Sequence, residues 1–128
     1  MKDAPFVGVR NRVYKELVAQ MEQRTADLSE FWNKFTWKEL EIKQRISKIS
    51  LEEIGWPAGH FIPSDPFEII LWGGKGDLAT VAAIDRIEKE LGLIKRSDRE
   101  WQELAARTFG DVVQKIAAEV AQKKSDER

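Results

Sequence analysis

Residues 108–120, TFGDVVQKIAAEV, decide the fold class more clearly than any other stretch of this chain. Thr108, with Asp111 three residues on, is typical of a helix start, because a threonine hydroxyl can accept a hydrogen bond from a backbone N–H of the first turn. Apolar residues then recur at spacings of three and four, which places them on one helix face. They are Phe109, Val112, Val113, Ile116 and Val120. The stretch therefore predicts an amphipathic helix.

The residues before this helix follow the same pattern. Residues 77–91 carry an apolar stripe that drifts slowly around a helix, and Gly92 is a natural residue to end it. The stripe consists of Leu78, Val81, Ile84, Ile87 and Leu91. Ser97 or Asp98 can then cap a short helix in residues 97–106, SDREWQELAA, which is expected to bury Trp101 and Leu104. Two further helices are predicted in this way.

The N-terminal half predicts helices as well. Between Val9 and Arg24, apolar residues recur at steps of four, and residues 28–35 place four large apolar side chains at helical spacing. They are Leu28, Phe31, Trp32 and Phe35, and we expect them in the core. Thr36 with Glu39 is a capping-box signature that opens a helix through Ile49. Ser50 repeats the device, which predicts one more turn through Ile54.

Residues 55–76 differ, because Pro57, Pro63 and Pro66 forbid a continuous helix. The segment is nevertheless rich in large apolar residues, so we expect a long loop packed on the core, with a short helical or extended piece at residues 66–72. The prediction is one all-α domain over residues 1–128. It comprises an N-terminal helical extension (1–36), a bundle (37–122) and a frayed tail (123–128).

Composition limits the function classes. The 128 residues hold 21 basic and 22 acidic side chains and no cysteine. A net charge of −1 gives no electrostatic case for nucleic acid. The lack of cysteine excludes disulfides and thiol nucleophiles, and it is compatible with a reducing compartment. No apolar stretch approaches the roughly 20 residues that span a bilayer, so we expect a cytoplasmic protein without a membrane partner.

The glycine-rich residues 73–78, GGKGDL, suggest a phosphate-binding loop before a helix. A P-loop, however, needs Ser or Thr directly after its lysine, where the hydroxyl binds Mg²⁺. Here Gly76 and Asp77 follow Lys75, and a carboxylate would repel phosphate. The parallel strand that precedes such a loop is also missing from the pattern. We therefore do not expect nucleotide binding.

Taken together, residues 76–93 (GDLATVAAIDRIEKELGL), 97–106 and 108–120 stand in an order and spacing that resemble the second half of an acyl carrier protein. The resemblance covers roughly residues 60–120, and Trp37 to Ile49 would supply the first helix. It implies a four-helix carrier-like bundle with an extra N-terminal helix. In that family a serine in the signature Asp-Ser-Leu carries 4′-phosphopantetheine, so the resemblance also implies where a prosthetic arm would be attached.

Asp77 stands at the position of that serine. A carboxylate cannot accept the arm through a stable phosphodiester, and no serine occurs between Ser64 and Ser97. Thr80 is the nearest hydroxyl, and we expect it to be an ordinary helix residue. Asp77 also has a purely structural reason to be there, since an acidic residue in the first turn stabilises a helix by about 0.5–2 kcal/mol. We expect no cofactor and no catalysis.

The resemblance also implies a docking surface for a protein partner. Carrier proteins dock partners through the helix that follows the modified serine, which here carries mixed charges. The expected contact residues are Trp72, Lys75, Asp77, Asp85 and Glu88. Exposure of Trp56 and Trp72 would favour such a surface, because contiguous surface aromatics mark interfaces. Burial would instead favour an extended core.

Several alternatives remain open. The chain could be a genuine carrier modified at Ser64, or an unrelated helical accessory or immunity-type binding protein. The N-terminal helix could cover the bundle or form a homodimer. His60 with Asp65 and Glu68 is a weak metal-site candidate, because one histidine and two carboxylates on a loop lack ligand spacing of any specificity. No metal site is therefore predicted.

Overall fold

The computed structural model describes residues 4–24, 27–74 and 76–126, with side chains from residue 11 to residue 122 in those ranges. In order, the helices are α1 (Ala4–Gln23), α2 (Trp37–Ile49), the π-helical turn η1 (Ser50–Ile54), α3 (Phe67–Trp72), α4 (Asp77–Glu90), α5 (Asp98–Ala105) and α6 (Phe109–Asp126). One backbone bridge, between Pro66 and Thr108, is the only β-structure in these ranges. The predicted all-α class is confirmed, and the four-helix carrier arrangement stays a prediction.

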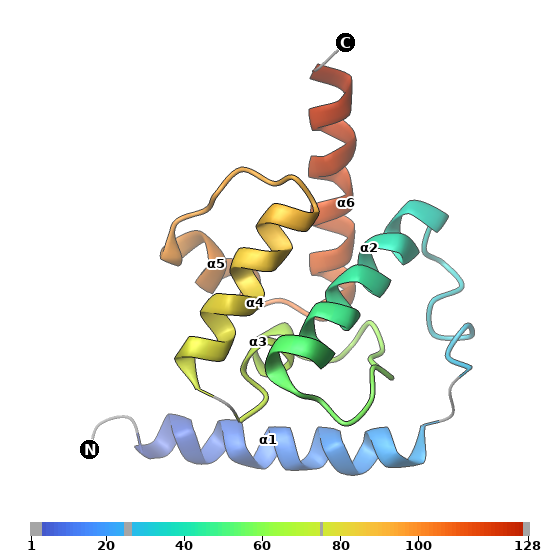
Figure 1. Ribbon diagram of the computed structural model, residues 1–128. Coiled ribbons are helices and arrows are strands. Elements are labelled where there is room, and N and C mark those ends of the chain that lie inside the picture. The colour runs from blue at the N-terminus through green and yellow to red at the C-terminus, as the bar shows by residue number, and fades with distance from the viewer. Residues whose placement is uncertain (1–3, 25–26, 75, 127–128) are drawn as a thin grey trace.

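The helices surround a core that is built around α3 (Figure 1). α2 packs against α6, and α4 packs against α3 and η1. α1 lies across one end of the bundle, while the C-terminal half of α6 projects from the opposite end (Figure 1). Fully buried rings of Phe61, Phe67 and Phe109 join the central loop to α3 and α6. The loop segment therefore belongs to the core, as its apolar composition predicted.

Side-chain capping explains where α2, α5 and α6 begin. Thr36 accepts a hydrogen bond from the N–H of Glu39, whose side chain bonds back to the N–H of Thr36. Ser97 and Glu100 form the same reciprocal pair at the start of α5. The hydroxyl of Thr108 accepts from the N–H of Asp111 at 3.3 Å. These predicted helix starts are confirmed.

The helix that the spacing of residues 28–35 indicated is not formed, because residues 29–34 form successive turns. The carboxylate of Asp27 accepts hydrogen bonds from both the N–H and the hydroxyl of Ser29, and such local side-chain bonds compete with helix formation. Leu28 and Trp32 are buried as expected, whereas Phe31 is 53% exposed. The N-terminal extension thus consists of one long helix followed by a turn-rich segment.

Ser50 also differs from its prediction. Rather than capping a separate helix, it continues α2 into η1, and its buried hydroxyl has no hydrogen-bond partner within the described residues. The helical turn does run to Ile54 as predicted, and Gly55 ends it with a φ of 87°. A glycine is favoured there because L-residues avoid this left-handed region.

Candidate partner-binding groove

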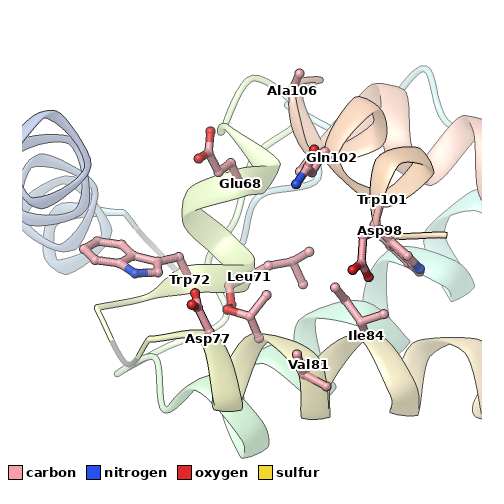
Figure 2. A pocket seen from close by; sticks show the side chains of 12 residues that line it. Glu68, Leu71, Trp72, Asp77, Val81, Ile84, Asp98, Trp101, Gln102 and Ala106 are labelled. Carbon is pink, nitrogen blue, oxygen red and sulfur yellow. The ribbon is translucent and has the colours of Figure 1, made fainter. Parts of the chain in front are cut away.

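A hollow of about 460 Å³ opens between α3, α4 and α5 (Figure 2), and we call it the α4 groove. Its lining residues come from three helices that follow one another in the sequence. They are Glu68, Leu71 and Trp72 of α3, Asp77, Thr80, Val81 and Ile84 of α4, and Asp98, Trp101, Gln102 and Ala105 of α5, together with Ala106, which follows α5. The groove has an apolar interior and several carboxylates along it.

The wall formed by α3 is held in place by a close backbone approach. Gly73 ends α3 with a φ of 49°, and its N–H donates to the carbonyl of Ile69 at 2.8 Å. A Cβ atom at Gly73 would lie 2.1 Å from Cγ2 of Ile54. Only glycine therefore fits both the conformation and the contact with η1.

The opposite wall, α4, is tied to α3 by Thr80. Its hydroxyl donates to the carbonyl of Leu71 at 2.8 Å and lies 3.3 Å from the carbonyl of Gly76. Gly76, with a φ of 91°, precedes α4 without a side-chain cap, which leaves the first turn open beside Asp77. Thr80 is half-buried and links α4 to α3, and Asp77 is exposed at the helix start.

Two apolar side chains of α4 face solvent, and one of them, Val81, lines the groove. Leu78 is 89% exposed and Val81 is 62% exposed, although the apolar stripe predicted them on the buried face. The stripe drifts around the helix so that only Ile87 of its members is fully buried, and Ala83 takes the inner position one turn earlier. Exposed apolar side chains beside a hollow are typical of an interaction site.

The groove carries negative charge. Three carboxylates line it, those of Glu68, Asp77 and Asp98, and no lysine or arginine is among the described residues of its lining. Figure 2 shows the three on separate helices around the apolar side chains of Leu71, Val81 and Ile84. A ligand that is apolar at its centre and positively charged at its edge would match this arrangement.

Asp85 and Glu88, which the sequence predicted on the same surface, lie in different environments. Asp85 is exposed and pairs with Lys89 at 3.0 Å. Glu88 is only 8% exposed, and its carboxylate accepts from the N–H of Arg96 at 2.8 Å and from Nε1 of Trp101 at 3.1 Å. Glu88 therefore positions α5 at the groove, and we remove it from the proposed contact surface.

The two tryptophans also differ from each other. Trp56 is buried, and its Nε1 donates to the carbonyl of Ile70 at 2.8 Å. Trp72 is half-buried at one end of the groove and reaches toward α1 (Figure 2), where Tyr14 meets it edge-on at 6.1 Å. The burial of Trp56 assigns it to the core, and only part of Trp72 remains for a partner. Lys75 lies outside the described residues.

The alternative hydroxyl and the candidate metal ligands lie elsewhere. Ser64 is exposed on a turn and lines a separate hollow beside α1, together with Gln20 and Arg24. Asp65 forms a buried ion pair with Arg24, so the guanidinium already balances the charge of its carboxylate. Within the described ranges, no group of three or more histidine and acidic side chains is arranged to hold a metal ion.

The sequence did not indicate that Val81 and Trp101 line a groove, because their apolar character is also typical of core packing. Across the described part of the chain, no helix is long and apolar enough to cross a membrane. Comparison with known protein families, with curated proteins and with solved structures gives no match.

Proposed function

We propose that this protein is a carrier-like helical module that lacks a prosthetic arm and acts by binding a protein partner in the α4 groove. The observation that carries the proposal is the 62% exposure of Val81 in the lining of a hollow whose interior is apolar. Covering one such side chain contributes about 1.5–3 kcal/mol. The module is proposed to need neither catalysis nor a bound cofactor for this role.

The charges define the chemistry of the partner. An apolar side chain of the partner would enter between Leu71, Ile84 and Trp101, and lysine or arginine beside it would meet the carboxylates of Asp77 and Asp98. Charge complementarity of this kind mainly raises the association rate and the specificity. A partner with an acidic rim would be repelled.

Asp77 supports the proposed loss of the arm in two ways. It offers no hydroxyl to a phosphopantetheinyl transferase, and its charge adds to a rim that would repel the phosphate of an arm. Thr80, the nearest hydroxyl, donates to the carbonyl of Leu71 and is half-buried. The exposed Ser64, on the hollow beside α1, remains the alternative acceptor.

The missing arm is tested by intact mass after incubation with coenzyme A and a broad-specificity phosphopantetheinyl transferase. We expect no added mass, while a serine-bearing carrier in the same tube is modified. An added phosphopantetheine would contradict this part of the proposal, and peptide mapping would then show whether Ser64 is the acceptor.

The binding role is tested by quantitative co-purification with matched variants. Val81→Glu places a carboxylate in the groove, and Ala19→Glu places one on an exposed position of α1. Both positions are solvent-exposed, so neither change should unfold the protein. We expect the Val81 variant alone to lose specific partners. Equal recovery of every protein by both variants would argue against the groove.

A further inference from the structure

Trp37 presents a second apolar feature, and it shares no residue with the α4 groove. It is the first residue of α2, and its indole is 70% exposed. Lys38 holds its Nζ 5.7 Å from the ring centre, which leaves most of the ring accessible. A tryptophan is the side chain that contributes most to protein interfaces, because it buries a large area with few rotatable bonds.

A small hollow of about 80 Å³ lies directly beside Trp37, between α2 and α6. Ile42 is buried at its base, and α6 contributes Ala117, Val120 and Ala121. The two alanines are one helical turn apart, so their short side chains leave room where longer ones would fill the space. The feature therefore combines a projecting ring with an adjoining apolar recess.

The same surface carries one charge of each sign. Lys38 and Glu41 both line the hollow and are both exposed. Glu41 also lies 3.6 Å from Arg45, but both side chains are about half exposed, and such pairs contribute little. Such a surface is complementary to a second copy of itself, because the positive charge of one copy can meet the negative charge of the other and the ring of one can enter the recess of the other.

We propose that a second copy of this chain binds here, with the two α2 helices antiparallel across a twofold axis. In an antiparallel pair, residues opposite each other have position numbers with a constant sum. A register that sets Lys38 against Glu41 of the other copy therefore also sets Trp37 against Ile42, the base of the recess. One register satisfies the charges and the apolar contact together, as an isologous interface requires.

Other surfaces fit a second copy less well. Leu17 and Met21 of α1 are already buried in their own chain, so these two side chains are not available for contact with a second copy. The lining of the α4 groove includes the carboxylates of Asp77 and Asp98, so two copies of it would bring like charges together. The α2 surface is small, so the dimer should be weak and in exchange with monomer.

The test is sedimentation equilibrium of the full chain over micromolar to millimolar concentrations. We expect the native chain to self-associate, and Lys38→Glu and Glu41→Lys each to weaken association by about tenfold or more, because like charges then face each other. An equimolar mixture of the two variants should form heterodimers and recover the native affinity. In such a heterodimer, both carboxylates of one copy face both ammonium groups of the other.

Thermal unfolding serves as the control that each variant remains folded. Lys38→Glu adds an acidic residue to the first turn of α2, which favours the helix, so its stability should not fall. Trp37→Ala should abolish association while the chain stays folded. A native chain that remains monomeric throughout would overturn the proposal, and so would a dimer that neither charge variant weakens or a mixture that fails to recover.

Discussion

The guanidinium of Arg24 donates two hydrogen bonds to the carboxylate of Asp65, at 2.8 Å and 2.9 Å. The same guanidinium donates to the carbonyl of His60 at 2.7 Å, and the carbonyl of Asp65 accepts from the N–H of Phe109 at 2.8 Å. One buried ion pair thus joins the end of α1, the central loop and the start of α6. This loop is therefore a fixed part of the bundle.

Removing the guanidinium should be costly because it leaves Asp65 charged and buried. We expect Arg24→Met to lower the free energy of unfolding by about 3–5 kcal/mol, measured by urea denaturation. Lys89→Met breaks the exposed pair with Asp85 and should cost about 1 kcal/mol or less. Equal effects of the two substitutions would show that the buried pair does not hold the loop.

Gly73 should tolerate no side chain. Gly73→Ala combines a left-handed backbone, worth about 1–2 kcal/mol, with a clash against Ile54. Gly74→Ala supplies the matched control, because its φ is 75° but its Cβ would meet Tyr14 at an ordinary 3.5 Å. In urea unfolding the first variant should lose clearly more stability than the second. Similar losses of stability in the two variants would mean that backbone strain alone accounts for the cost, with no contribution from the clash with Ile54.

Substitutions of Glu88 and Asp85 should differ in their effect on stability, because only Glu88 holds buried hydrogen bonds. Glu88→Ala leaves the N–H of Arg96 and Nε1 of Trp101 without their acceptor and should cost about 2–3 kcal/mol in thermal or urea unfolding. Asp85→Ala removes only an exposed pair and should leave stability nearly unchanged. A stable Glu88 variant would contradict the positioning role that we assign to this carboxylate.

Two exposed carboxylates should make stability fall in acid. The hydrogen bond from Arg86 lowers the pKa of Glu52, and bonds from the backbone and hydroxyl of Ser97 lower the pKa of Glu100. A carboxylate with a lowered folded pKa stabilises the fold above its ordinary value of 4.5 and loses that contribution as pH falls through the folded pKa. The urea midpoint should therefore be nearly constant from pH 7 to about 5 and then decline.

Glu52→Gln and Glu100→Gln test the source of this decline. Each variant should begin with a slightly lower midpoint at pH 7 and lose less between neutral and acidic pH than the native chain. A native midpoint that does not change down to about pH 3, or a decline that neither variant reduces, would contradict the assignment.

The sequence predicted those features that depend on neighbours along the chain. Thr36 with Glu39 and Ser97 with Glu100 signal helix starts because each pair completes its hydrogen bonds within one turn. The spacing of Val112, Val113 and Ile116 places them on one face of α6, and all three are fully buried. Local chemistry was sufficient for these elements.

Features that depend on how one helix packs against another could not be predicted. Glu88 lies in a charged run and reads as a surface residue, but Trp101 of α5 approaches it and supplies a donor. Leu78 and Val81 read as core residues, because nothing in α4 shows that α3 and α5 leave this side uncovered. The groove exists only once these three helices pack together.

Photo-crosslinking in cells tests most directly whether a partner binds in the α4 groove. One version of the protein carries a photoreactive phenylalanine at position 81, in the groove, and the other carries it at position 19, on the exposed side of α1. We expect a discrete adduct from position 81, which the double substitution Asp77→Lys with Asp98→Lys suppresses, and no such adduct from position 19. The same adducts from both positions, or an adduct from position 81 that the charge reversals leave unchanged, would contradict a partner-binding role for the α4 groove.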